Sequence, residues 1–307
     1  MATKKKKRLT TSKVILALTA VLILLILFTN FNAILRGEFS LEAYFADLFG
    51  IAAPTPSVAQ RGSGEMRIHF LDVGQGDSAF IELASGKTLL IDTGEYGYGN
   101  DIVKYIKALG YDAVDHLVLT HPHSDHIGGA RPVLRGLTVG RVWMPDATNN
   151  NSSYVKTLEL IDELNIPLSI AKAGDTIEPG LTVLSPAEDA AWKDLNDWSI
   201  VLLIKYLDYS FLFTGDATQN VEKTVSPGKI NVLKVGHHGS HTSTGKDFIK
   251  ALQPEYAVIS LGAGNDYGYP HQETLEALEK VMVYRTDLSG TVICSCTEDG
   301  LSFSTEK

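Results

Sequence analysis

The sequence predicts an α/β fold in which two β-sheets pack face to face with helices on the outside. The chain has 307 residues, of which 44% are apolar and 21% charged, a composition typical of a globular protein. Short apolar runs separated by glycine turns follow one another from Met66 to Asp92. Later apolar runs alternate with helical patterns. Together these features predict one domain over residues 66–307.

The individual elements follow from apolar spacing and from turn residues. Strands are predicted at 67–73, 78–83, 88–92, 115–120, 141–144, 181–184, 200–206, 210–214, 230–235, 256–261, 281–285, 291–295 and 301–304. Helices are predicted at 101–109, 126–134, 154–164, 218–225, 245–252 and 272–280. Gly110 is expected to end the first of these helices.

The N-terminus has the pattern of a membrane anchor. Residues 4–8 are all Lys or Arg, and residues 14–28 form an uncharged, almost wholly apolar run. At 1.5 Å per residue this run spans roughly 22 Å, and continuing it to residue 35 makes it long enough to cross a bilayer. We expect a basic cytoplasmic segment at 1–13, a transmembrane or signal-anchor helix at 14–35 and a linker at 36–65. A cleaved signal peptide is the alternative, which bulky Phe31 disfavours because it lies two residues before Ala33, the nearest candidate cleavage site.

The basic N-terminus predicts that the domain lies outside the cell, and the net charge of the domain bears on the kind of ligand it binds. Because positive charge stays on the cytoplasmic side, a single-pass anchor would leave residues 36–307 outside, and cleavage would release them as a secreted protein. Residues 66–307 hold 19 basic and 32 acidic side chains, a net charge of −13. This acidic body weighs against a long nucleic acid held by a broad basic surface. The two cysteines, Cys294 and Cys296, exclude a disulfide framework and are expected to pack in the core.

The segment THPHSDH at 120–126 carries the strongest functional signal. His121, His123, Asp125 and His126 lie within six residues, directly after an apolar strand. Imidazole and carboxylate donors of this kind bind borderline divalent ions. A loop is needed, because neither helical nor strand periodicity would turn all four side chains inward. The segment therefore predicts ligands for one or two divalent metal ions, with Zn or Mn as the candidates.

The pattern H-x-H-x-D-H resembles the metallo-β-lactamase superfamily, and three further segments agree with it. These are LIDTG at 90–94, FTGD at 213–216 and KVGHHGS at 234–240. FLDVGQGDS at 70–78, HHGS at 237–240 and NDWSIVL at 196–202 are similar to segments of ComEC/Rec2-like competence-protein domains. The resemblance covers roughly residues 66–304 and implies a four-layer αββα sandwich. It does not extend to a multi-helix channel, so it does not imply DNA uptake.

The resemblance also implies roles for single residues. Asp216 would bridge two metal ions, His237 would be a further ligand, and Asp92 would support the metal loop. Asp125, Asp216 and His271 would be the catalytic residues, with Asp125 accepting a proton or orienting the nucleophile. The residues expected to contact the substrate are His238, Ser240 and Asn196.

Two positions depart from the family pattern. No histidine lies between His126 and His237, where many members place a further ligand, and Asn196 is a candidate oxygen donor in that interval. Tyr269 stands in the segment YGYPH at 267–271, where relatives tend to read YGHPH.

These observations predict an exported metal-dependent hydrolase of ComEC-like type. It would use a metal-bound hydroxide as a phosphodiesterase or nuclease, with a phosphodiester such as DNA as substrate and no protein partner. One alternative is a cell-surface phosphodiester esterase of phosphocholine type, since an acidic body suits a small substrate. A non-catalytic metal-binding relic is the other alternative. The absence of a mid-chain histidine disfavours hydrolysis of lactones or β-lactams.

Overall fold

The computed structural model describes residues 61–307, so the predicted basic segment, the predicted helix at 14–35 and most of the predicted linker lie outside the described residues. Within the described part, no helix combines the length and the apolar character needed to cross a bilayer.

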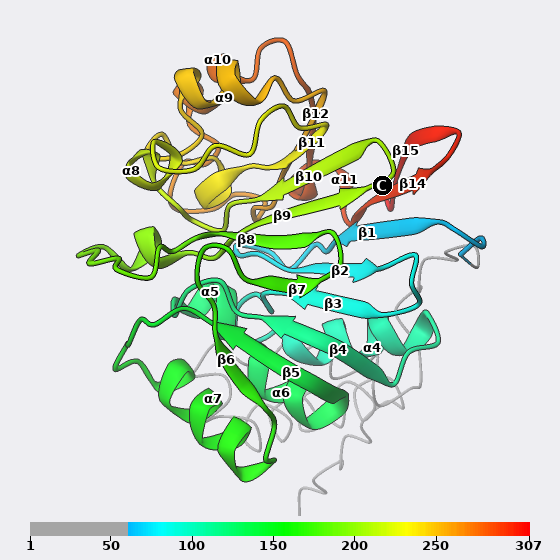
Figure 1. Ribbon diagram of the computed structural model, residues 1–307, viewed down its shortest axis with the longest axis vertical. Helices are drawn as coiled ribbons and strands as arrows, with labels where there is room; N and C mark the ends of the chain where they lie inside the picture. Colours follow the sequence, from blue (N-terminus) through cyan, green and yellow to red (C-terminus); the bar gives the residue numbers. More distant parts are fainter. Residues whose placement is uncertain (1–60) are drawn as a thin grey trace, which may run out of the picture. The chain divides into compact units, whose positions relative to one another are not determined.

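Two mixed sheets form the centre of this domain (Figure 1). The eight-stranded sheet has the order β15-β14-β1-β2-β3-β4-β5-β6. Its strands in chain order are β1 (Met66–Phe70), β2 (Ala79–Glu82), β3 (Thr88–Ile91), β4 (Ala113–Val118), β5 (Thr138–Met144), β6 (Leu168–Ile170), β14 (Val292–Thr297) and β15 (Gly300–Thr305). The seven-stranded sheet has the order β13-β12-β11-β10-β9-β8-β7. Its strands are β7 (Thr176–Glu178), β8 (Leu181–Ser185), β9 (Val201–Tyr206), β10 (Tyr209–Phe213), β11 (Val232–Lys234), β12 (Tyr256–Ile259) and β13 (Met282–Arg285).

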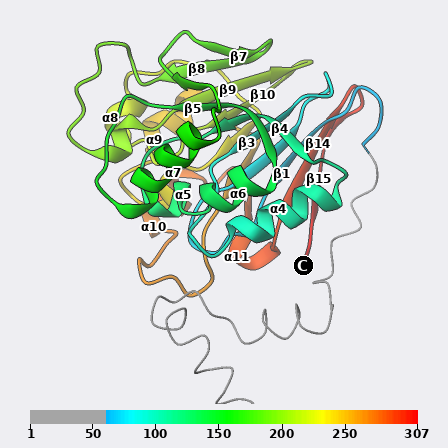
Figure 2. The same cartoon turned by 90° about the horizontal axis from the view of Figure 1, so that it is seen from below.

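Helices cover the outer face of each sheet (Figures 1 and 2). The helices of the first half are α4 (Gly99–Ala108), α5 (Ser124–Ile127), α6 (Ala130–Gly136) and α7 (Ser152–Glu163). Those of the second half are α8 (Gln219–Glu222), α9 (Lys246–Leu252), α10 (Gln272–Ala277) and α11 (Thr286–Ser289). Two single-turn 3₁₀ helices, η1 (Leu195–Trp198) and η2 (Gly236–Gly239), lie in loops. The predicted two-sheet sandwich with outer helices is thus confirmed.

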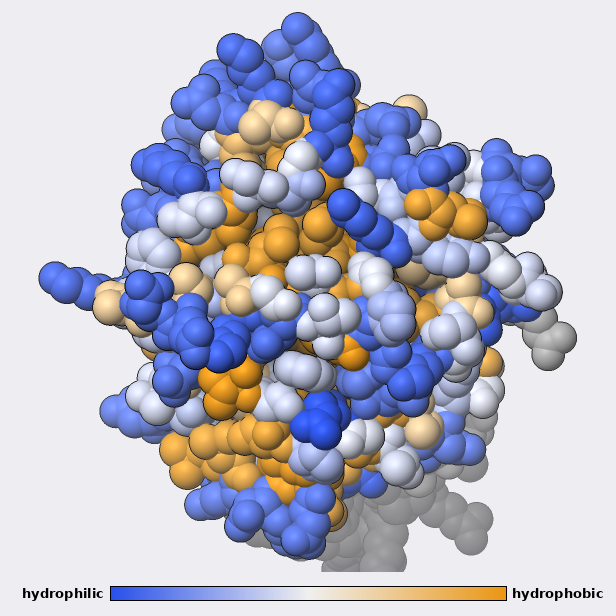
Figure 3. All heavy atoms as spheres, in the orientation of Figure 1, coloured by the Kyte–Doolittle hydropathy of each residue, from blue (hydrophilic) through white to orange (hydrophobic). Residues whose placement is uncertain are grey.

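Strand alternation produces three layers of core. On β9, Leu202 and Ile204 face the core between the two sheets, whereas Val201 and Leu203 face the core beneath the outer helices. The central core also holds both cysteines, which are buried and unpaired. On the face drawn in Figure 3, hydrophilic residues cover much of the surface, with apolar ones in patches between them.

The predicted helix at 126–134 is two separate helices, α5 and α6. Gly128 and Gly129 separate them. The N–H of Gly129 donates to the carbonyl oxygen of Gly94 at 3.1 Å, and the carbonyl oxygen of Asp125 accepts from Asp77 at 3.2 Å, so these two groups do not form the helical hydrogen bond with each other. Glycine is needed at 129, because a Cβ atom there would lie 2.2 Å from the backbone oxygen of Thr93. The N–H of Thr93 donates to the carbonyl oxygen of His126 at 2.7 Å, which joins the loop of residues 121–126 to the loop that follows β3.

Candidate metal centre

The candidate metal centre lies where loops from both sheets meet. The loop at 121–126 follows β4 of the eight-stranded sheet, whereas Asp216 follows β10 and His238 follows β11 of the seven-stranded sheet. β4 is parallel to β3, and β11 is parallel to β10. Since loops at the carboxyl ends of neighbouring parallel strands share one edge of a sheet, the topology brings these distant residues together.

Asp92 anchors the loop at 121–126. Its buried carboxylate accepts hydrogen bonds from the backbone N–H and the hydroxyl of Thr120, each at 2.7 Å, and from Nδ1 of His126 at 2.8 Å. The φ angle of Asp92 is 55°, in the left-handed region that aspartate adopts more readily than most residues. Because Nδ1 of His126 donates its proton to Asp92, Nε2 is the nitrogen left to bind a metal ion.

A backbone carbonyl orients His238 in the same way. Nδ1 of His238 donates to the carbonyl oxygen of Ser260 at 3.0 Å, so that this nitrogen must carry the proton. Nε2 of His238 then faces Oδ2 of Asp125 at 3.2 Å.

His121 is oriented by two hydroxyls. The Thr120 hydroxyl already donates to Asp92, so it accepts from Nδ1 of His121, 3.2 Å away. The Ser199 hydroxyl lies 3.4 Å from the same nitrogen. Nε2 of His121 is therefore the free nitrogen, and it lies 3.0 Å from Nδ1 of His123.

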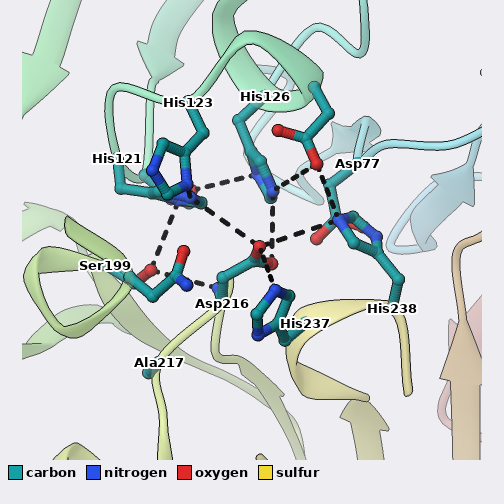
Figure 4. A network of polar contacts seen from close by, with 12 residues as sticks. Asp77, His121, His123, His126, Ser199, Asp216, Ala217, His237 and His238 are labelled. Carbon is teal, nitrogen blue, oxygen red and sulfur yellow. Dashed lines mark hydrogen bonds and ion pairs between the residues drawn. The ribbon is translucent and has the colours of Figure 1, made fainter. Parts of the chain in front are cut away.

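Donor atoms converge in two clusters that share Asp216 (Figure 4). The first cluster is His121, His123 and Asp216, and the second is Asp125, His126, Asp216 and His238. Within each cluster the donor atoms all lie within 4.8 Å of one another. Imidazole nitrogens and carboxylate oxygens in this number match the donor set of zinc and related divalent ions.

Two buried atoms at the centre support a cation there. Nε2 of His126 and Oδ1 of Asp216 face each other at 3.2 Å, and neither has a hydrogen-bond partner outside this contact. A buried polar atom without a partner costs about 1–3 kcal/mol, and a divalent ion would bind both atoms. The residues of the two clusters therefore fit one or two divalent cations.

The carboxylates of the centre are held in their ionised form. Burial by itself would raise the pKa of Asp216, but the charges of His126 and His238 keep that pKa well below its ordinary value. Burial likewise opposes ionisation of Asp125, and here too the charge of His126 and the hydrogen bond from His238 lower the pKa. Burial would lower the pKa of His238, whereas Asp216 and Asp77 raise it to about 10. The centre thus presents negative oxygens to an incoming cation.

The tandem histidines take different positions from those that the sequence suggests. His238, expected to contact the substrate, contributes a nitrogen to the second cluster. His237, expected to be a ligand, lies outside both clusters, although its Nε2 is 3.6 Å from Oδ2 of Asp216. Its Nδ1 lies 3.1 Å from the Thr242 hydroxyl. Its role as a ligand stays a prediction.

Three other predicted residues also lie outside the two clusters. Nδ1 of His271 lies 2.8 Å from Nδ1 of His241. The ring of Tyr269 is a neighbour of His271 and of both tandem histidines. Ser240 is buried, with its hydroxyl 3.0 Å from that of Thr242. Asn196 lies in η1, and its buried Oδ1 makes no hydrogen bond. Their roles toward a substrate stay predictions.

The sequence pattern does not predict the buried ion pair between Asp77 and Lys234, which lies at the centre. Asp77 lies 2.7 Å from Nζ of Lys234, and its other oxygen lies 3.3 Å from Nδ1 of His238. Asp77 belongs to the segment FLDVGQGDS, and Lys234 begins the segment KVGHHGS, but nothing local shows that the two meet. The pair supports His238 from the side opposite Asp125.

Comparisons with known proteins agree with this arrangement. Residues 71–263 match the family described as the Metallo-beta-lactamase superfamily. ComE operon protein 3 of Bacillus subtilis (strain 168) is 35% identical over 257 residues, which cover 75% of this chain and 33% of that protein. Recombination protein 2 of Haemophilus influenzae is 33% identical over 247 residues, covering 76% of this chain and 29% of that protein. The chain thus spans about a third of the length of these curated relatives.

Among solved structures, the metallo-beta-lactamase fold protein YhfI from Bacillus subtilis superposes with a TM-score of 0.51 at 13% identity, over 72% of this chain and 96% of that one. At this identity the likeness concerns the fold alone. The family match covers most of the described domain, including the loop at 121–126, Asp216 and His238. The chain therefore belongs to the metallo-β-lactamase superfamily, and its sandwich domain is similar to those of the ComEC/Rec2-like competence proteins.

Proposed function

We propose that the chain is a metal-dependent phosphodiesterase of ComEC/Rec2-like type, with nuclease activity as its expected form. The observation that carries the proposal is the position of Asp216, whose carboxylate belongs to both donor clusters. The two clusters would hold two divalent ions, and such a pair would stabilise both the attacking and the leaving oxygen of phosphoryl transfer.

Bound divalent ions would lower the pKa of water and polarise a phosphoryl oxygen. The protein's own part falls mainly to Asp125, whose side chain is 27% exposed, whereas the other members of its cluster are buried. Asp125 can therefore meet both solvent and substrate, and we assign it the proton of the attacking water. Asp92 and Ser260 keep His126 and His238 in the tautomers that leave Nε2 free.

A small phosphodiester such as a phosphocholine ester is the second candidate substrate. The net charge of −13 over residues 66–307 favours it, because a long polyanion would be repelled. A non-catalytic metal-binding relic is the third reading, and the complete set of histidine and aspartate donors at 121–126 counts against it. Both readings are outcomes of the experiment below.

Hydrolysis of bis(p-nitrophenyl) phosphate tests the proposal on the full-length chain loaded with zinc or manganese. The wild type should hydrolyse it, and Asp216→Asn and His123→Ala should each lower kcat/KM by at least about 100-fold, since metal ligands are lost. His116→Ala is the matched control, because His116 lies on β4 but bonds Glu178 at 2.9 Å, outside both clusters. Equal rates in wild type and Asp216→Asn would contradict the proposal, and a wild type that binds metal without hydrolysing the ester would favour the relic. Release of choline phosphate without cleavage of DNA would favour the second candidate.

We also propose that residues 14–35 hold the domain at the outer face of the cell membrane. The basic run at 4–8 followed by the apolar run at 14–28 supports this topology. Protease added to intact cells should digest the domain. In untreated cells the domain should be found in the membrane fraction. Recovery of the domain in the medium would instead indicate signal cleavage, and protection from protease would contradict export.

A further inference from the structure

A pair of stacked tyrosines lies at the edge of the metal centre and has no part in it. Tyr267 and Tyr269 belong to the loop that joins β12 to α10 (Figure 1). Their ring centroids are 5.3 Å apart and their planes differ by 15°. Tyr269 in turn lies 6.4 Å from His238 and 5.9 Å from His237, measured between ring centroids. The stack therefore begins on the histidines of the centre and extends outward.

The outer ring of the stack is open to solvent. Tyr267 is 63% exposed, one of the most exposed large apolar residues in the described part of the chain. Nε2 of His238 lies 3.2 Å from Asp125, and the ring of His238 is the neighbour of Tyr269 at the inner end of the stack. The row of rings therefore runs from the histidine that faces Asp125 through Tyr269 to the exposed Tyr267.

Hydrogen bonds fix the loop that carries both tyrosines. The Asn265 side chain donates to the carbonyl oxygens of Gly262 and Tyr269 and accepts from the N–H of Tyr269, at 2.9–3.1 Å. Gly262 packs against Gln75, so closely that a Cβ atom would lie 2.7 Å from the Gln75 nitrogen. A surface fixed in this way loses little conformational freedom when a ligand binds to it.

We propose that Tyr267 and Tyr269 form a stacking platform for an unpaired nucleobase beside the reacting phosphate, so that single-stranded nucleic acid is the preferred substrate. This inference rests on the proposed phosphodiesterase function and assigns its specificity to Tyr267. The parallel rings offer one flat face, which matches the face of any base. Bases within a duplex are covered on both sides by their neighbours, so only an unpaired base can use the platform.

The charge of the domain limits how a nucleic acid could be bound. The net charge of −13 over residues 66–307 disfavours many phosphate contacts, so affinity for a polynucleotide would come from the bases and from the metal centre. A quaternary ammonium group such as choline would instead need ring faces turned toward one point, which parallel rings do not provide. Glu95 adds negative charge near Tyr267, and choline phosphate esters are therefore included in the test.

The first measurement compares kcat/KM for three oligonucleotides of equal length: single-stranded, duplex and abasic. The wild type should cleave the single strand about tenfold or more faster than either of the others. Tyr267→Leu should remove this advantage and leave cleavage of the abasic strand unchanged, whereas Tyr267→Phe should keep it because the ring face remains. Met282→Ala is the control, because Met282 is similarly exposed (58%). It begins β13 and pairs with Tyr256 at the start of β12, whereas the loop with the two tyrosines follows the end of β12.

The second measurement needs no catalysis. With EDTA present, a single strand that contains 2-aminopurine should lose fluorescence on binding to the wild type and to Tyr267→Phe, and should keep it with Tyr267→Leu. Quenching without hydrolysis would support the platform and overturn the phosphodiesterase proposal. The opposite result would be hydrolysis of bis(p-nitrophenyl) phosphate together with equal cleavage of all three oligonucleotides by wild type and Tyr267→Leu. It would support the phosphodiesterase proposal and overturn the platform. A platform whose loss slows only p-nitrophenyl phosphorylcholine hydrolysis would overturn the nucleobase assignment in favour of a cationic headgroup.

Discussion

The backbone N–H of Asp216 donates a hydrogen bond to the hydroxyl of Ser199 at 3.0 Å. That hydroxyl also lies 3.4 Å from Nδ1 of His121. One buried side chain that ligates nothing thus positions two members of the first cluster, which come from opposite sheets. It forms part of the outer layer of contacts that sets the geometry of a metal site.

Ser199→Ala should therefore weaken metal binding more than it weakens the fold. Loss of such an orienting contact typically costs 10- to 100-fold in metal affinity, whereas one lost hydrogen bond costs about 1 kcal/mol of stability. Zinc titration by calorimetry and urea unfolding of the metal-free protein measure the two effects. Thr88→Val is the matched control, because the buried Thr88 begins β3, at the opposite end of that strand from Asp92, and its hydroxyl donates to Asp115 at 3.1 Å. Equal zinc affinity in both variants would contradict the assigned role.

Asp92→Asn should impair the second cluster through the tautomer of His126. Asparagine tolerates the left-handed backbone at this position, so the main change is a carboxylate oxygen replaced by an NH₂ group. Facing that donor, Nδ1 of His126 would have to give up its proton, and Nε2 would then carry it and lose its free lone pair. We expect 10- to 100-fold weaker metal binding and a free energy of unfolding lower by about 1–3 kcal/mol. Metal analysis after dialysis checks the first effect, and unchanged stoichiometry and affinity would refute it.

Glu222 makes stability depend on pH. Burial raises the pKa of its carboxyl to about 7, although the backbone N–H groups of Thr244 and Gly245 bond to it. Because the folded pKa lies above the unfolded value of 4.5, the folded state holds the proton more tightly. The stabilisation is complete below the unfolded pKa and is lost as pH rises from there through about 7, by up to about 3 kcal/mol.

Glu222→Gln, which cannot ionise, should remove this part of the pH dependence. Urea unfolding at pH 5 and pH 8 with EDTA present gives the comparison. The difference in stability between the two pH values should be larger for the wild type than for the variant. Parallel pH dependences in the two proteins would show that Glu222 does not titrate in this range.

Phe211→Ala should destabilise the sandwich without involving the metal centre. Phe211 is 1% exposed on β10 and belongs to the core between the two sheets. Truncation of a buried phenylalanine costs about 3–5 kcal/mol because it leaves a cavity. Thermal or urea unfolding measures the loss. Leu207→Ala, at the exposed β9–β10 turn, should change stability by less than about 0.5 kcal/mol, and a comparable loss there would contradict the assignment.

The fold could be predicted where an apolar run is long enough to stand out. The run at 200–206 begins with five consecutive apolar residues, typical of a strand buried on both faces, and the structure has β9 there. β6 (Leu168–Ile170) and β7 (Thr176–Glu178) have three residues each, too few for a period to appear, and they were not predicted. The break between α5 and α6 depends on hydrogen bonds with Gly94 and Asp77, which no local window contains.

The same distinction holds for the candidate site. The loop at 121–126 could be recognised because its donors are contiguous in sequence. Both rings of His237–His238 lie within 3.7 Å of Asp216, but only His238 belongs to a cluster. This could not be predicted, because both residues have left-handed backbones and the carbonyl of Ser260 selects the ring orientation of His238. The pairing of Asp77 with Lys234 depends likewise on the packing of distant segments.

Both clusters combine Asp216 with residues 121–126, which the ribosome adds to the chain much earlier. The histidine loop and its aspartate belong to strands of opposite sheets, so neither half of the chain can assemble the pocket alone. A cation bound there would link the two sheets of the domain. Metal binding would then follow the folding of both sheets, and removal of the metal by a chelator should weaken the packing between the sheets before either one unfolds.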